Sequence, residues 1–259
     1  MLRLLCVRAA VAFLLLTTVS VAPADDARPK RYLIIHADDA GMSHSVNVAT
    51  IEGMEKGVVS SASIMVPCPW FNEIAEYARK NPDKDFGIHL TLNSEWDGYR
   101  WGPVAPREKV PSLLDKDGYL WKSDNDTAAN GRAEEVEIEL RAQIERARKF
   151  GVPVTHLDTH MGAVFARADF AEIYIRLGIE YNLPVLFPSP GFASIIEKGF
   201  PALDGKAVEF SKLLQKNDLS TLDYILQYYK SGPDDERKAL YLKNLDILPP
   251  GISEFIIHC

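Results

Sequence analysis

The sequence predicts a single α/β domain in which a parallel sheet closes into a barrel. Short apolar runs that are typical of strands alternate with helical patterns along the chain, and this alternation favours βα units around a parallel sheet. The 259 residues, less a predicted 24-residue leader, leave 235, a usual length for a one-domain α/β barrel. We find no internal repeat and no second domain, so we expect residues 25–259 to fold as one unit.

The predicted leader, residues 1–24, has the features of a secretory signal peptide. Arg3 and Arg8 precede the apolar stretch, which runs from residue 9 to residue 21 and is followed by the small-residue exit Ala22-Pro23-Ala24. This stretch is shorter than the ~20 residues of a membrane span, so an uncleaved anchor is the weaker alternative. We therefore expect export to the periplasm or the outside of the cell, with no stable membrane span after cleavage.

The first elements are two strands and two helices. Tyr32–Ile35 and Ser63–Val66 are short apolar runs of the kind found in buried strands. Ser43 is a suitable N-cap for a helix that ends near Gly57. The helix predicted over 70–80 has apolar residues at helical spacing and stops at an Asn-Pro pair.

A third strand and the clearest helix follow. Residues 86–93, "FGIHLTLN", alternate strictly between apolar and polar side chains, which predicts a strand with His89 on its polar face. Residues 132–150 carry an apolar stripe at helical spacing and are ended by Gly151 and Pro153. The remaining predicted elements are a strand at 154–160, a helix at 170–181, a strand at 184–187 and a last strand at 254–259.

The segment 94–131 interrupts this alternation. It contains no long periodic run but has five aromatic residues, which argue against disorder. One interpretation is a lid that packs on itself. The other is a wall for a sugar substrate, with Trp96, Trp101 and Trp121 as stacking faces. Both interpretations can hold.

Charge and cysteine content exclude several classes of protein. Removal of Arg3 and Arg8 with the leader leaves 27 basic against 36 acidic residues, a net charge of −9. No basic run remains beyond residues 28–31, so nucleic acid is not an expected partner. Two distant cysteines, Cys68 and Cys259, do not make a disulfide scaffold. The sequence gives no indication of an oligomeric state.

Histidines and carboxylates gather at or near the ends of predicted strands. Five of the six histidines lie on or just beyond predicted strands, and the pair Asp38-Asp39 comes at the end of the first predicted strand. Active sites of βα barrels lie at the carboxyl ends of strands. Adjacent carboxylates there need a compensating cation. We therefore predict a metal site in which one aspartate and two imidazoles bind the ion and the other aspartate takes a proton from water. This ligand set suits Zn²⁺, although Mg²⁺ or Mn²⁺ is an alternative.

Four motifs carry a resemblance to a known family. "ADDAG" at 37–41, "GIHLTLN" at 87–93, "THLDTH" at 155–160 and "FIIH" at 255–258 resemble the YdjC/ChbG family of carbohydrate deacetylases. The resemblance implies a distorted (β/α) TIM-like barrel and metal-dependent removal of N-acetyl groups from oligosaccharides such as chitooligosaccharides.

The resemblance also implies roles for single residues. The ligands of one divalent ion, Mg²⁺ or Zn²⁺, would be Asp39, His89 and His160. Asp38 would be the general base, and His258 a general acid for the leaving amine. Family members usually continue past the last histidine, so we expect the chain to be C-terminally incomplete.

Other polar residues near the motifs are less defined. Asp158 lies two residues before His160 and could accept a hydrogen bond from a metal-binding imidazole, with an ordinary salt bridge as the alternative. His36, His44 and His156 have no assigned role. A glycosidase is disfavoured because neighbouring aspartates cannot flank one glycosidic bond. A non-catalytic carbohydrate-binding protein on the same barrel remains the second interpretation.

Overall fold

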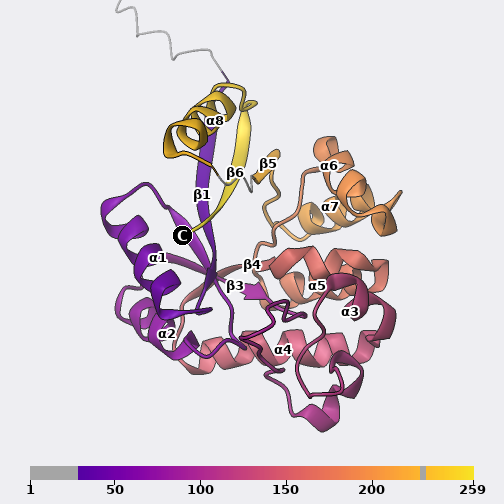
Figure 1. Cartoon of the computed structure of the whole chain (residues 1–259). Helices are drawn as coiled ribbons and strands as arrows, with labels where there is room; N and C mark the ends of the chain where they lie inside the picture. Colours follow the sequence, from indigo (N-terminus) through magenta and orange to yellow (C-terminus); the bar gives the residue numbers. More distant parts are fainter. Residues whose placement is uncertain (1–28, 228–231) are drawn as a thin grey trace, which may run out of the picture.

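The chain forms a six-stranded parallel sheet surrounded by helices (Figure 1). The computed structural model describes residues 29–227 and 232–259. The α/β prediction is confirmed, and the predicted signal peptide lies outside the described residues. The strand order is β4-β3-β2-β1-β6-β5. The strands are β1 Arg31–Ala40, β2 Ser61–Ile64, β3 Asp85–Leu90, β4 Val154–Thr159, β5 Tyr224–Gln227 and β6 Gly251–His258.

Local sequence signals explain several helix boundaries. Ser43 caps α1 by accepting a hydrogen bond from the backbone N–H of Val46, and Gly57 follows its last residue. The apolar stripe of α4 is buried as predicted. In the described residues no helix is both long and apolar enough to cross a membrane. The helices are α1 His44–Lys56, α2 Phe71–Lys80, α3 Asp124–Asn130, α4 Ala133–Lys149, α5 Ala168–Tyr181, α6 Ser194–Gly199, α7 Ala207–Lys216 and α8 Asp234–Asp246.

Residues 184–189 lie between the two edges of the sheet. The predicted strand at 184–187 forms only a single parallel bridge, from Val185 to Leu157 of β4. The Leu186 N–H donates to the Leu157 carbonyl over 2.8 Å, and the Leu222 N–H, just before β5, donates to the Phe187 carbonyl over 2.9 Å. These bonds connect both edges to one segment, but a regular closed barrel is not established and stays a prediction.

Strands β1 and β6 are hydrogen-bonded neighbours in the sheet and lie side by side (Figure 1). Strand β1 runs to Ala40, beyond the predicted end at Ile35, so the two aspartates lie on the strand and not after it. The register pairs Asp38 with His258, which brings the first and last motifs together. Helix α8 lies against β5 and β6 near a small cluster of Leu226, Leu248 and Phe255.

The segment 94–131 is anchored on α4 by buried carboxylates. Glu139 accepts the backbone N–H groups of Val104 and Ala105, each over 2.9 Å. Burial raises the pKa of Glu139 to about 7, in spite of these hydrogen bonds. Trp101 is buried and its indole N–H donates to the Asn93 carbonyl. The segment therefore packs on the domain as an ordered lid, in agreement with the first of the two interpretations.

Candidate metal centre

The backbone at the end of β1 turns two adjacent aspartates toward one site. On a regular strand, neighbouring side chains point to opposite faces. Asp39 instead adopts a left-handed backbone (φ 68°), and the pairing with β2 shifts register between Ala37 and Ala40. A non-glycine residue in this region costs on the order of 1–3 kcal/mol and is typical of functional sites. The bulge lets Asp38 and Asp39 face the same group of histidines.

Three donor atoms converge at this bulge. Asp39 Oδ1 lies 3.3 Å from His89 Nε2 and 3.2 Å from His160 Nδ1. Asp39, His89 and His160 offer one ligand atom each within 4.8 Å of one another. The structure therefore brings the three predicted ligands together, and their role as metal ligands stays a prediction.

The other nitrogen of each imidazole has a carboxylate partner. His89 Nδ1 lies 2.7 Å from Asp158 Oδ1, and His160 Nε2 lies 3.1 Å from Glu95 Oε2. If each of these nitrogens carries the proton and donates it, the nitrogen that faces Asp39 keeps its lone pair. Histidines that bind metals usually have such a carboxylate or carbonyl partner.

Among the described residues, two buried carboxylate oxygens without a well-formed hydrogen bond indicate that a cation fits here. Within the described part of the chain, Oδ1 of Asp38 and Oδ1 of Asp39 are buried and accept no hydrogen bond of good geometry. Buried charges of this kind are normally paired or bound to a metal. Two imidazoles and a carboxylate form a donor set that binds divalent metals, Zn²⁺ among them. The residues present could therefore hold a divalent ion.

The pKa values show that the site attracts positive charge. Burial by itself would lower the pKa of His89, but the charges of Asp158 and Asp38 raise it well above its usual value. Burial likewise opposes ionisation of Asp39, but the His160 and His89 imidazoles lower its pKa. A cation bound among these residues would take the place of the protons that the histidines otherwise hold.

Asp38 and His258 lie beside the three donors. Burial raises the pKa of Asp38 to about 7, against the opposing effect of His89. His258 Nε2 lies 3.9 Å from Asp38 Oδ2 and 3.8 Å from Asp39 Oδ2. Burial lowers the pKa of His258. Both side chains are thus within reach of a small reactant at the same point.

A cavity of about 630 Å³ opens onto this group. Asp38, Asp39, His89, His160 and His258 all line it. Its other walls are largely apolar. They include Trp96, Met161, Phe165, Leu186, Ile195, Ile196, Phe200, Ile225 and Ile256.

The three tryptophans predicted to contact substrate lie in different places in the structure. Trp96 lines the cavity and its side chain is half exposed. Trp101 lies behind His160, with ring centroids 6.3 Å apart, and Trp121 donates its indole N–H to the Ser112 carbonyl inside the lid. Buried indoles need such internal partners. The substrate-wall interpretation is therefore corrected to Trp96 alone, and the other two tryptophans are lid residues.

Two residues of the site were not identified from the sequence. Glu95 lies at the start of the lid, where no periodic pattern of apolar residues marked it.

His36 had no assigned role, but its Nε2 lies 3.0 Å from Asp158 Oδ2 and 3.3 Å from Asp38 Oδ1. Burial lowers the pKa of His36, but Asp158 and other carboxylates raise it to about 9. Asp158 therefore contacts both His36 and His89. His44 lies at the surface, against Glu73.

The chain is similar to known proteins over most of its length. A carbohydrate deacetylase of Thermus thermophilus is 36% identical over 236 residues, which cover 88% of this chain and 77% of that protein. A carbohydrate deacetylase of Thermoanaerobacter pseudethanolicus is 32% identical over 228 residues, or 88% of this chain and 80% of that protein.

A solved structure is also similar. It is that of a proposed cellobiose-phosphate cleavage protein from Enterococcus faecalis, 28% identical, with a TM-score of 0.68 over 89% of this chain and 81% of that one. The family model described as YdjC-like protein matches residues 32–259. The chain therefore belongs to the YdjC-like protein family.

Proposed function

We propose that the protein is a metal-dependent hydrolase that removes N-acetyl groups from oligosaccharides. The observation that carries the proposal is the convergence of Asp39, His89 and His160 beside Asp38 at the wall of one cavity. The names of the two deacetylase relatives support the reaction type. Asp39 Oδ1, His89 Nε2 and His160 Nδ1 would hold one divalent ion, Zn²⁺ or Mg²⁺.

The ion would supply polarisation of the acetyl carbonyl and a lowered pKa for water. Asp38 accepts the proton of the attacking water, because it is the buried carboxylate next to the donors that has no hydrogen bond to its Oδ1 within the described residues. His258 donates a proton to the nitrogen as the C–N bond breaks. The products are acetate and a free amine on the sugar.

The remaining residues hold this arrangement. Asp158 and Glu95 fix the orientation of the two imidazoles through their second nitrogens. Trp96 offers a flat face at the rim of the cavity, where it would stack on the apolar face of a sugar. The cavity of about 630 Å³ leaves room for more than the acetyl group, which suits an oligosaccharide.

The test is to incubate the protein with a panel of N-acetylated oligosaccharides and to measure both acetate and new reducing ends. Acetate without new reducing ends is expected, with loss of acetate release in His89→Ala and His160→Ala. New reducing ends without acetate would indicate a glycosidase. Substrate binding without either product would favour the non-catalytic carbohydrate-binding protein.

Export is part of the proposal. A hydrolase of oligosaccharides that carries residues 1–24 as a signal peptide would meet its substrates outside the cytoplasm. Cell fractionation of a producing strain tests this location directly.

A further inference from the structure

A second cavity, of about 270 Å³, lies nearer the N-terminal ends of the strands. It is lined by His36 of β1 and by His156 and Asp158 of β4, together with Asp85 and Glu254. Asp85 and Glu254 have no part in the proposed reaction. Buried imidazoles and carboxylates that face one cavity, such as His36 and Asp158, need hydrogen-bond partners or a cation.

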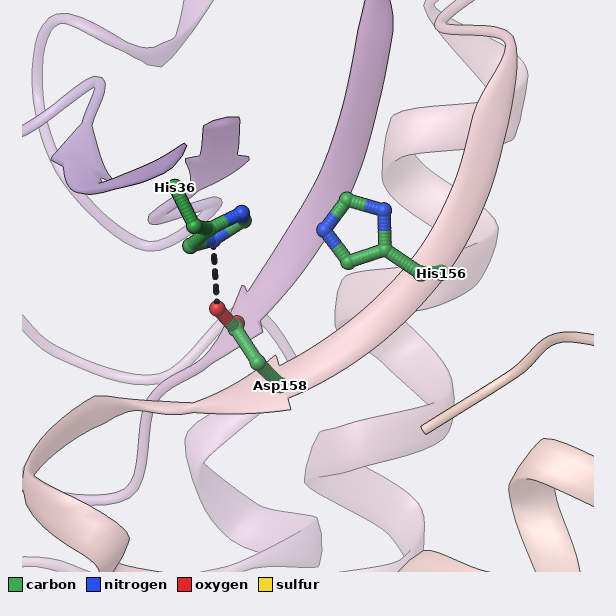
Figure 2. Close-up of side chains that lie close together, drawn as sticks. All are labelled: His36, His156 and Asp158. Atoms are coloured by element: carbon green, nitrogen blue, oxygen red, sulfur yellow. Dashed lines mark hydrogen bonds and ion pairs between the residues drawn. The ribbon is translucent and has the colours of Figure 1, made fainter. Parts of the chain in front are cut away.

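The His156 side chain has a buried nitrogen that points at the other two residues. Figure 2 shows the His36 ring hydrogen-bonded to Asp158 and the His156 ring with one nitrogen directed toward that pair. His156 Nε2 is buried and has no hydrogen-bond partner within the described residues. His36, His156 and Asp158 offer one ligand atom each within 4.8 Å of one another. This nitrogen therefore presents a lone pair or an unused proton to the cavity.

The opposite nitrogens of both rings are held in place. His36 Nδ1 lies 2.9 Å from Ser61 Oγ. His156 Nδ1 lies 2.9 Å from Thr155 Oγ1 and 3.4 Å from Asp85 Oδ1. A proton on each Nδ1 would leave a lone pair on both Nε2 atoms, of which the Nε2 of His36 also lies 3.1 Å from Ser63 Oγ. A lone pair on the nitrogen that faces the ion is the arrangement in metal-binding histidines.

A glycine makes room for the His156 ring. A Cβ at Gly87 of β3 would lie 2.3 Å from His156 Nε2 and Cδ2, closer than any real contact. Any other residue at position 87 would therefore displace the ring from its present position.

We propose that His36, His156 and Asp158 form a second divalent-cation site, separate from the one at Asp39, His89 and His160. Two imidazoles and a carboxylate favour Zn²⁺. The ion would tie β1 to β4, strands that are not neighbours in the sheet. It would act as a structural ion, because none of its three ligands lines the large cavity.

Asp158 would connect the two sites. Its Oδ2 faces His36, and its Oδ1 lies 2.7 Å from His89 Nδ1. An ion at the second site would fix the Asp158 carboxylate and, through it, the ring of His89. Loading of the second site should therefore tighten metal binding at the first.

The test counts zinc in the purified protein. Wild type and variants are equilibrated with excess ZnCl₂, passed through gel filtration, and analysed by mass spectrometry of the metal. We expect about two zinc ions per chain in wild type, one in His156→Gln, one in His160→Ala and none in the double variant. Two ions in His156→Gln, or a single ion in wild type that His160→Ala removes, would overturn the proposal.

Matched variants separate ligand loss from misfolding. Gly87→Ala keeps every donor but displaces the His156 ring, so it should lose the same ion as His156→Gln. His44→Gln removes an exposed histidine and should keep both ions. Circular dichroism checks folding, and full zinc content in a folded Gly87→Ala protein would contradict the assigned site. If His160→Ala keeps its full zinc while His156→Gln loses one ion, the second site stands and the first assignment fails.

Discussion

Glu95 provides the sharpest test of how the first metal centre is supported. Its Oε2 lies 3.1 Å from His160 Nε2, and its side chain is 28% exposed. Burial opposes its ionisation, but the His160 imidazole lowers its pKa, so the carboxylate is charged at neutral pH. A hydrogen bond to a charged group contributes ~1.5–3 kcal/mol, and partial exposure favours the low end of this range.

The expected effect of Glu95→Ala is therefore a loss of about 1.5 kcal/mol in metal binding, or about tenfold in Kd. This agrees with the ~10–100-fold effect of removing a partner of a metal-binding histidine. Glu95→Gln should lose less, because its amide oxygen still accepts the His160 N–H. Zinc Kd is measured by competition with a chromophoric chelator.

The matched control is Glu108→Ala, which removes an exposed carboxylate from the same lid. It should leave the Kd unchanged. A Glu95→Ala protein that is folded and binds zinc as tightly as wild type would refute the reasoning that His160 is oriented by Glu95.

Other predictions concern the reaction, the substrate, the fold and the leader. Asp38→Asn should keep the metal and lose at least ~10²-fold in kcat, whereas Asp39→Asn should raise the metal Kd; equal behaviour of the two variants would contradict the division of roles. Trp96→Ala should raise KM more for long oligosaccharides than for an acetylated monosaccharide, and equal effects would make it a lid residue only. Glu137 forms an ion pair with Arg176 that lowers its pKa to about 2. Because the pKa of Glu137 is lower in the folded than in the unfolded state, its charge stabilises the fold above about pH 4.5. The free energy of unfolding, measured with urea, should therefore be larger for wild type than for Glu137→Gln above that pH, and the two values should converge as the pH falls toward 2. N-terminal sequencing of exported protein should begin after residue 24, and a sequence that starts at Met1 would contradict the signal peptide.

The strands and helices that the sequence predicted are those with strong apolar patterns. Strand β3 and helix α4 were found within a few residues because their apolar side chains repeat at the periods of strand and helix. Helix α8 was not predicted, since its one buried residue is the polar Asn244 and it has no apolar stripe. Strand β5 was not predicted either, because it is only four residues long and has one buried residue, too few for a recognisable apolar pattern.

The types of residue at the site and the position of Asp158 beside them were predictable, but the backbone of Asp39 and the carboxylate partner of His160 were not. Asp39, His89 and His160 were placed by motifs at the ends of strands. The left-handed backbone of Asp39 depends on pairing between β1 and β2, which a sequence pattern does not encode. Glu95 reaches His160 through the path of the lid, a tertiary feature without a local signal. The course of the lid backbone also places the indoles of Trp101 and Trp121 against backbone carbonyls, those of Asn93 and Ser112, and not against the large cavity.

The most direct test of the central proposal is the dependence of acetate release on the metal at the Asp39 site. The protein is stripped with a chelator, and Zn²⁺ or Mg²⁺ is returned while acetate release from an N-acetylated chitooligosaccharide is measured. We predict that activity vanishes on stripping and returns with the ion in wild type but not in His89→Ala or His160→Ala. Undiminished acetate release by the stripped protein, or restored activity in both variants, would contradict the account.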